Sequence, residues 1–191
     1  MTLFRRLLPR AADQHGLLTP TDALAEGGTR MALVMLARRG TLERITHGIY
    51  RVPELAGDRL EQYQEALLRF PAGVLSHDTA LDLHDLCDIN PAKVHITVPA
   101  RLRIRGEVPA WLTIHRDTFA ENEVTWLDGL AIVTPARAIV DGIAAALGDR
   151  FVDQAIAAAR ERNLLTTREE QRVELARTMQ RARHLQNALA T

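Results

Sequence analysis

The chain is poor in cysteine and has no long apolar run. Cys87 is its only cysteine, so an intramolecular disulfide is impossible, and no Cys/His spacing matches a structural zinc site. Three arginines, Arg5, Arg6 and Arg10, interrupt the apolar residues at the start of the chain, and no segment of about eighteen apolar residues could span a bilayer. These absences argue against a disulfide-stapled or membrane-bound protein, and we expect a cytoplasmic one.

The sequence also lacks the motifs of common enzymes. Gly27 and Gly28 are adjacent, but the lysine that a phosphate-binding P-loop needs does not follow them. Ser76 and His77 are adjacent without the context of a nucleophile elbow, and neighbouring side chains on a helix diverge. We therefore expect no enzymatic activity, no metal and no cofactor.

Charge is balanced over the whole chain but unevenly distributed along it. There are 24 basic and 24 acidic residues in total. The first 52 residues contain eight arginines against four acidic residues, so the rest of the chain carries the compensating negative excess. A basic N-terminal segment on an acidic body is typical of a protein that holds DNA phosphates with one part. Lys93 is the only lysine, so almost every basic residue of the chain is an arginine whatever its role. The positions of the arginines, and not their number, are therefore the evidence for DNA binding.

Residues 16–52 have the pattern of a winged helix-turn-helix. A short helix over 20–25 can be capped by Thr19 and opens with proline, which the first helical position tolerates. A pair of glycines permits a tight turn, and Thr29 can cap a second helix over about 30–39. This second helix is the expected recognition helix.

The predicted recognition helix presents two stripes of residues at helical spacing. The stripe predicted to pack inward is apolar and consists of Leu33, Leu36 and Ala37. The stripe predicted to face outward recurs at four-residue steps and consists of Arg30, Val34 and Arg38. Two β-favouring runs, 41–45 and 49–52, follow around a turn at Gly48 and predict a wing.

We assign this surface to duplex DNA. Arg30 lies near the start of the predicted recognition helix, where a guanidinium can engage guanine O6 and N7. Phosphate contacts are assigned to four other arginines, namely Arg38, Arg39, Arg44 and Arg51. Thr29, Val34 and His47 complete the predicted DNA-binding set. The alternative is a winged module that serves only as a protein-interaction surface.

A domain boundary is expected near Pro53. It divides the chain into a DNA-binding domain of residues 1–54 and a second domain of residues 55–191. The second domain alternates helical and period-two patterns, with a strong two-residue turn at Asp128-Gly129. Helices are predicted over 58–70, 76–86, 135–147, 150–163 and 167–189, and strands over 94–98, 112–117, 124–127 and 130–133. The fold class is therefore α+β: a winged helix-turn-helix followed by a small antiparallel sheet packed with helices.

A histidine and aspartate cluster follows Ser76. His77 and His84 lie nearly on one helical face, but seven residues separate their imidazoles by about 10 Å along the axis, too far to share one ion. We therefore expect a structural role, with Ser76 capping the helix and His84 contacting backbone. Partner binding is the alternative, and a metal-dependent hydrolase is the least favoured interpretation. Arg137 and Asp141, four residues apart, are expected to form an intrahelical ion pair.

The last two predicted helices carry many arginines. They are expected to cover the sheet as an amphipathic pair. The alternative is a basic tail that adds phosphate contacts or meets an acidic partner. The arginines concerned are Arg160, Arg162, Arg168, Arg172, Arg177, Arg181 and Arg183.

Three groups of residues resemble the AbiEi-like antitoxins of abortive-infection type IV toxin-antitoxin systems. The first is the wing sequence GTLERI at 40–45 with GIY at 48–50. The second is LSHDTALDLH at 75–84, which is similar to the family's S-H-x-T-A-L-x-L-H run. The third is ITVP at 96–99 with VTPARAIVD at 133–141. The chain has Asp85 where the family run usually has glycine.

The resemblance implies an antitoxin that binds inverted repeats in its own promoter, represses its operon and counteracts a nucleotidyltransferase-type toxin encoded beside it. The matching motifs make six residues candidates for the antitoxin function: Ser76, His77, Thr79, His84, Arg137 and Asp141. The alternative is a winged-helix transcriptional regulator whose C-terminal domain senses a ligand or oligomerises, without antitoxin activity.

Overall fold

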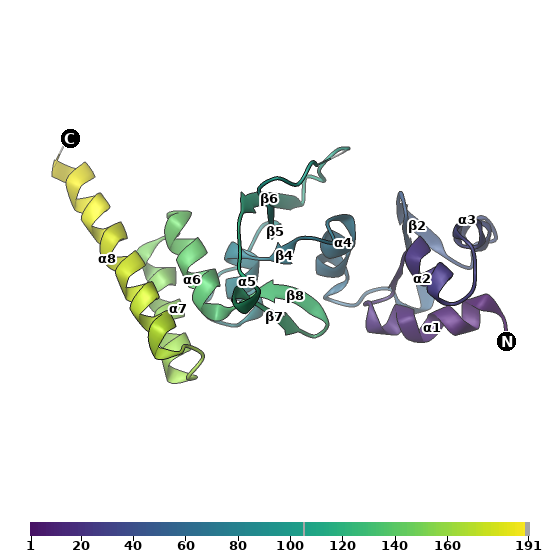
Figure 1. Cartoon of the computed structure of the whole chain (residues 1–191), viewed down its shortest axis with the longest axis horizontal. Helices are drawn as coiled ribbons and strands as arrows, with labels where there is room; N and C mark the ends of the chain where they lie inside the picture. Colours follow the sequence, from purple (N-terminus) through teal and green to yellow (C-terminus); the bar gives the residue numbers. More distant parts are fainter. Residues whose placement is uncertain (105, 190–191) are drawn as a thin grey trace. The chain divides into compact units, whose positions relative to one another are not determined.

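The computed structural model describes residues 1–104 and 106–189 (Figure 1). It divides into two compact units. Unit 1 comprises Met1–Pro71 with Asp128–Leu130, and unit 2 comprises Ala72–Leu127 and the chain from Ala131 onward. Both units contain helices and strands, so the α+β class expected from the sequence is confirmed.

Unit 1 contains a three-stranded antiparallel sheet with the strand order β1-β3-β2. Its elements are α1 (Leu3–Asp13), β1 (Leu17–Leu18), α2 (Pro20–Ala25), α3 (Arg30–Arg38), β2 (Glu43–Thr46), β3 (Ile49–Arg51), the short 3-10 helix η1 (Pro53–Leu55) and α4 (Glu61–Arg69). Helices α2 and α3 and the β2–β3 hairpin lie where the sequence predicts two helices and two strands. Gly48 has a φ of 78° in the hairpin turn, as expected.

The helix starts in unit 1 follow the predicted capping chemistry. Thr19 and Asp22 form a reciprocal capping box at the start of α2, in which the Thr19 amide donates to the Asp22 carboxylate at 2.7 Å. The Thr29 hydroxyl accepts a hydrogen bond from the Ala32 amide at 3.2 Å, which caps α3. Each cap satisfies amides that the first helical turn leaves without partners.

Helix α1 is absent from the sequence prediction. Its Thr2 hydroxyl accepts from the Arg5 amide, and Leu7 and Ala11 are buried one turn apart on a single face. Arginines lie between the apolar residues of this segment, so the amphipathic pattern of the helix was not recognised in the sequence. The helix matters because its buried face closes one side of the unit 1 core.

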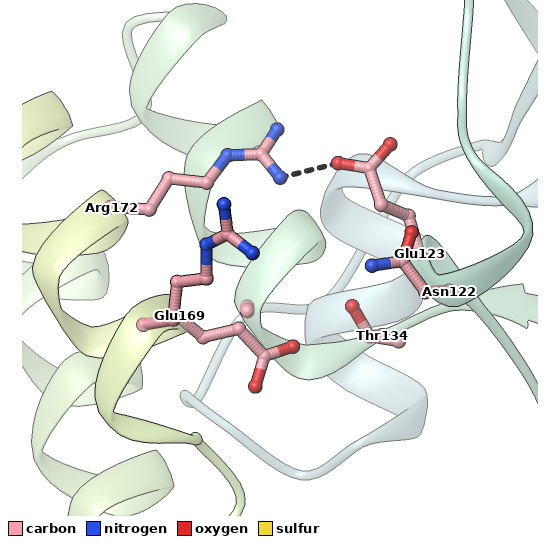
Figure 2. A pocket seen from close by; sticks show the side chains of 7 residues that line it. Asn122, Glu123, Thr134, Glu169 and Arg172 are labelled. Atoms are coloured by element: carbon pink, nitrogen blue, oxygen red, sulfur yellow. Dashed lines mark hydrogen bonds and ion pairs between the residues drawn. The ribbon is translucent and has the colours of Figure 1, made fainter.

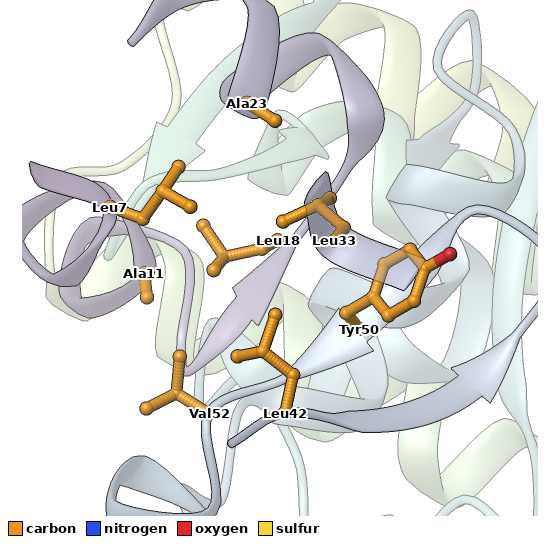
Figure 3. Packing of buried hydrophobic residues seen from close by; sticks show 8 residues of the cluster. All are labelled: Leu7, Ala11, Leu18, Ala23, Leu33, Leu42, Tyr50 and Val52. Carbon is orange, nitrogen blue, oxygen red and sulfur yellow. The ribbon is translucent and has the colours of Figure 1, made fainter. Parts of the chain in front are cut away.

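The core of unit 1 joins side chains from α1, β1, α2, α3 and β3 (Figure 3). Leu33 of α3 and Tyr50 of β3 are both buried in it. Burying a leucine side chain contributes about 1.5–3 kcal/mol, so this packing fixes α3 against the sheet. The cluster consists of Leu7, Ala11, Leu18, Ala23, Leu33, Leu42, Tyr50 and Val52.

Unit 2 is built around a five-stranded sheet with the strand order β6-β5-β4-β8-β7. Helix α6 packs against α5, α7 and α8, and α5 packs against β5 (Figure 1). The elements are β4 (Val74–Leu75), α5 (His77–Leu83), β5 (Val94–Pro99), β6 (Leu112–Asp117), the 3-10 helix η2 (Glu121–Glu123), β7 (Val124–Leu127), β8 (Leu130–Val133), α6 (Pro135–Ala144), α7 (Asp149–Glu161) and α8 (Thr167–Leu189).

The prediction of an antiparallel sheet is wrong, because the sheet is mixed. Strands β5 and β6 pair in parallel with Val94 opposite Leu112, and β4 pairs in parallel with β8. Of the two neighbours of β4, only β5 is antiparallel to it. Period-two alternation indicates which face a residue occupies but not the direction of the strand. The segment 100–111 is long enough for the crossover that parallel strands require.

Within the described ranges, no helix is both long and apolar enough to cross a membrane.

Candidate functional site

The exposed surface of α3 carries polar and basic residues at both ends. Thr29 and Arg30 are exposed at its start, and Arg38 and Arg39 are exposed at its end. The predicted inward residues follow the expectation, because Leu33 is fully buried and Leu36 and Ala37 are half-buried. The α3 surface is therefore available to a ligand along its whole length.

Val34 does not belong to the exposed stripe on which the sequence places it. It is half-buried and packs against the unit 1 core. At 100° per residue, Val34 lies only a quarter turn from Leu33, within the wide apolar stripe of a globular helix. Met31 and Met35, each two residues and hence about 200° from Leu33, take the outward positions, with 61% and 39% of their surface exposed.

The β2–β3 hairpin presents Arg44 and His47 as predicted. Both side chains are exposed, and a guanidinium nitrogen of Arg44 lies 3.3 Å from His47 Nδ1. The Arg44 Nε also donates to the Thr46 carbonyl at 3.3 Å. These contacts orient the arginine without neutralising its charge.

Arg51, for which a phosphate contact is predicted, forms ion pairs within the protein. Its Nη1 donates to Glu43 Oε2 at 3.0 Å, and its Nε donates to Glu61 Oε1 at 2.8 Å. The hydrogen bond to Glu61 is the main influence that raises the pKa of Arg51. Glu61 belongs to α4, beyond the segment that suggested a wing, so local pattern could not reveal this partner.

The other arginines of the basic segment divide into two groups. Arg6 donates to the Glu26 carbonyl at 2.9 Å, and Arg10 forms an ion pair with Asp22 at 3.4 Å. Within the described part of residues 1–52, and apart from Arg6, five arginines form no ion pair with a carboxylate: Arg5, Arg30, Arg38, Arg39 and Arg44. Four of these five are on α3, directly after it or on the hairpin, which leaves that surface cationic.

A second polar site lies in unit 2, where three histidines from different elements meet. The His77 ring stacks on the His115 ring with centroids 3.5 Å apart and an interplanar angle of 10°. His115 Nε2 lies 3.1 Å from His95 Nδ1. His95 and His115 come from the parallel pair β5 and β6, and His77 comes from α5. His95 and His115 could not be predicted from the sequence as site residues, because only the unpredicted parallel pairing of β5 and β6 brings them together.

Burial keeps these imidazoles neutral. Desolvation, followed by the neighbouring His115 and His95 rings, lowers the pKa of His77 to about 3. Burial also lowers the pKa of His95 and of His115. Neutral rings can pack this closely, with His77 stacked on His115 and His95 tilted against both, whereas three imidazolium ions at these distances would repel one another.

Ser76 occupies the position before α5 but does not cap it, which corrects the prediction. It is fully buried, and its hydroxyl accepts a hydrogen bond from Thr97 Oγ1 at 2.8 Å. His77, the next residue, has a left-handed φ of 51°, a conformation that costs a non-glycine residue of order 1–3 kcal/mol. Because Ser76 has no exposed surface, it is inaccessible as a nucleophile even though its Oγ lies 3.0 Å from His77 Nδ1.

Thr79 and His84 hold α5 in place through backbone groups. The Thr79 hydroxyl accepts from the His95 amide at 2.8 Å, which joins α5 to β5. His84 Nε2 lies 2.8 Å from the Val133 carbonyl of β8, the backbone contact that the sequence analysis expected. Burial lowers the pKa of His84, so its imidazole is neutral and can donate to that carbonyl.

Arg137 is the centre of a charged network beside the histidines. The predicted pair with Asp141 is confirmed, with Nε donating to Asp141 Oδ1 at 2.6 Å. Two unpredicted carboxylates also accept from this guanidinium, Asp117 at 2.6 Å and Glu123 at 3.1 Å. Burial lowers the pKa of Arg137, but the hydrogen bond and charge of Asp141 and the nearby carboxylates raise it overall.

The remaining oxygen of Asp141 faces the histidine site. Asp141 Oδ2 lies 3.9 Å from His77 Nδ1 and has no hydrogen-bond partner among the described residues. Burial raises the pKa of Asp141 against the opposing effect of Arg137. Four of the six predicted antitoxin-domain residues, Ser76, His77, Arg137 and Asp141, therefore lie in one connected polar cluster, whereas Thr79 and His84 contact backbone beside it.

A polar cavity of about 380 Å³ opens beside this network (Figure 2). Arg172 of α8 reaches across it to form an ion pair with Glu123, and Thr134 lies at its base near the start of α6. The lining residues are Asn122, Glu123, Thr134, Ala136, Arg168, Glu169 and Arg172.

Several of the arginines in the last two helices bind carboxylates of unit 2. Arg160 pairs with Glu170 and Glu174, and Arg177 pairs with Asp149 and Asp153. These pairs, with those of Arg172 and Arg181, tie α7 and α8 to each other and to η2. In the part of the chain that the structure describes, no group of three or more His, Cys, Asp or Glu side chains is arranged to hold a metal ion.

Comparison with known proteins finds a matching family model and similarity to solved structures. No curated protein matches the chain. The crystal structure of the RV2827C protein from Mycobacterium tuberculosis is similar in fold, with a TM-score of 0.58, 17% sequence identity, and coverage of 89% of this chain and 70% of that one. Residues 5–53 match the family described as "Transcriptional regulator, AbiEi antitoxin", which confirms the resemblance seen in the sequence.

Proposed function

We propose that the chain is a DNA-binding antitoxin that represses its own operon. In this proposal, residues 1–54 form a winged helix-turn-helix that binds inverted repeats in the promoter. Residues 55–191 counteract a nucleotidyltransferase-type toxin. The family description of residues 5–53 supports the regulatory and antitoxin character of the chain.

The element order of unit 1 supports the winged helix. A helix, a strand, two helices and a two-stranded hairpin follow one another, and β1 completes the sheet beside β3. In winged helices of this kind, the second helix of the helix-turn-helix enters the major groove. Here α3 occupies that position, and the hairpin takes the place of the wing.

The observation that carries the proposal is the cationic surface of α3 and the hairpin. Arg30, Arg38, Arg39 and Arg44 are exposed and form no ion pairs with carboxylates within the described ranges. Guanidinium groups without such partners retain their charge for DNA phosphates, whereas Arg51 is already neutralised by Glu43 and Glu61. In this arrangement Arg30 reaches base edges, and the others contact phosphates.

The salt dependence of binding tests this surface. The full chain is titrated onto a duplex of its own promoter at increasing salt, and binding is followed by fluorescence anisotropy. If four arginines release counterions, log affinity should fall against log salt with a slope of roughly −3.6. The exposed Arg101 of unit 2 provides a matched control, because Arg101→Gln should leave the slope unchanged. A wild-type slope near zero would refute the DNA assignment.

The antitoxin part of the proposal is tested by co-expression with the protein that the adjacent gene encodes. Rescue of growth by the full chain but not by residues 1–55 is expected, because the antagonism is assigned to residues 55–191. Rescue by residues 1–55 alone would overturn that division of labour.

The cavity in unit 2 favours one alternative function, a regulator that senses a small ligand. Its volume of about 380 Å³ falls within the range of small-molecule sites, and charged side chains line it. A neighbouring protein that is harmless when expressed alone would favour this alternative over the antitoxin.

A further inference from the structure

The exposed surface of α3 has apolar side chains in its central part, and exposed arginines lie at both ends of the helix. Met31 and Met35 point away from the unit 1 core with 61% and 39% of their surface exposed. Arg30 precedes Met31 directly, and Arg38 and Arg39 follow Met35 within about one turn. Residues four apart are neighbours on a helix surface, so the two methionines form one apolar patch, and contiguous exposed apolar patches mark binding surfaces.

The spacing of the two methionines matches the geometry of duplex DNA. Four residues of α-helix rise about 6 Å, which is close to two base-pair steps of 3.4 Å. The thymine 5-methyl group is the apolar group that a base edge presents in the major groove. A flexible and polarisable methionine side chain adapts well to such a small apolar target.

We propose that Met31 and Met35 form an apolar ridge that contacts thymine methyl groups in the major groove and so selects thymine at two positions of each half-site. This inference rests on the proposed DNA-binding function and assigns part of its sequence specificity. The flanking arginines favour DNA over a protein partner, because their uncompensated charge complements phosphate on both sides of the ridge.

The test replaces thymine by uracil, which has the same hydrogen-bonding edge but no methyl group. A duplex is first selected from a randomised pool with the full-length protein. Each thymine is then replaced singly by uracil, and the Kd is measured at one fixed salt concentration. Wild-type protein should bind about fourfold more weakly at each contacted position, the effect of removing one buried methyl group.

The variants assign each contact to a side chain. Met31→Ala should abolish the preference for thymine over uracil at one position, and Met35→Ala should abolish it at the other. Met179→Ala is the matched control, because Met179 is exposed to a similar degree in unit 2 and should leave both preferences intact. Both α3 methionines are solvent-exposed, so the variants should retain the wild-type Tm.

Two results would overturn the inference while leaving DNA binding in place. One is equal binding of every uracil duplex by the wild-type protein. The other is a Met31→Ala, Met35→Ala variant that keeps the thymine preference but no longer binds the neighbouring protein, which would identify the ridge as a protein interface. Failure of the wild-type protein to select any duplex would instead refute the proposed function itself, and the thymine contacts with it.

Discussion

His77 stacks on His115 at a centroid separation of 3.5 Å, and the two rings come from α5 and β6. The pair is stable only while both imidazoles are neutral, because protonation would place two positive charges in a half-buried site. The packing of α5 against β6 therefore depends on His77 and His115 both remaining neutral.

Acidification is expected to destabilise unit 2. Burial and the neighbouring rings lower the pKa of His77 to about 3, whereas an unfolded histidine titrates near 6.5. Between these values the unfolded chain binds more protons, so the free energy of unfolding falls as the pH drops from about 6.5 toward 3. The slope contributed by one such group reaches about 1.4 kcal/mol per pH unit. Above about pH 7 the contribution of His77 is fully present and constant.

Denaturant unfolding of the full chain between pH 7.5 and pH 4.5 measures this slope. His77→Gln should make the dependence shallower, whereas His47→Gln alters an exposed hairpin side chain and serves as the control. Equal slopes for the wild type and His77→Gln would show that the histidine site does not govern acid sensitivity.

Removing the Arg137 guanidinium should cost far more stability than removing an exposed arginine. Arg137 is buried and binds Asp141, Asp117 and Glu123, so Arg137→Gln leaves the buried Asp141 carboxylate without its counter-charge. A loss of about 3–5 kcal/mol in the free energy of unfolding is expected. Arg150→Gln removes an exposed pair with Asp88 and should cost less than about 1 kcal/mol. Comparable losses in the two variants would contradict the central role of Arg137.

Arg51 and Arg38 should differ in their effects on DNA binding. Arg38 is exposed without a carboxylate partner in the described structure, so Arg38→Gln should weaken promoter binding and reduce the magnitude of the salt slope by about 0.9. Arg51→Gln should leave the slope nearly unchanged, because Glu43 and Glu61 already occupy the guanidinium. Anisotropy titrations over a salt series measure both slopes. A larger change for Arg51→Gln would show that this ion pair opens on DNA.

Local chemistry made several elements predictable from sequence. The cap at Thr29 and the Asp128-Gly129 turn each depend on residues within a few positions of one another. Their signals identified α3 and the β7–β8 hairpin with boundaries that agree closely with the structure. The same reasoning found the Arg137–Asp141 pair, since its partners lie one helical turn apart.

Long-range pairing accounts for what the sequence did not reveal. The parallel pairing of β5 and β6 places His95 beside His115, although 20 residues separate them in the sequence. The residues of either strand do not indicate the direction in which it pairs. Arg51 meets Glu61 of α4 only after the chain turns at η1. Val34 was misplaced for a different reason, because the apolar stripe of α3 is wider than the three residues used to define it.

The basic character of α8 is expected to be largely structural. Arg177 and Arg181 both bind Asp153, but 4% of the Arg177 side chain is exposed and 61% of the Arg181 side chain. Arg177→Ala should therefore lower the free energy of unfolding by about 1–3 kcal/mol, because it removes a buried guanidinium and leaves the buried Gln180 Oε1 without its hydrogen-bond donor. Arg181→Ala should cost less than about 1 kcal/mol. Urea unfolding of the two variants makes a matched comparison, since both remove a guanidinium from the same carboxylate. If both variants were as stable as the wild type and both lost neutralisation of the neighbouring protein, the arginines of α8 would belong to a partner surface rather than to the fold.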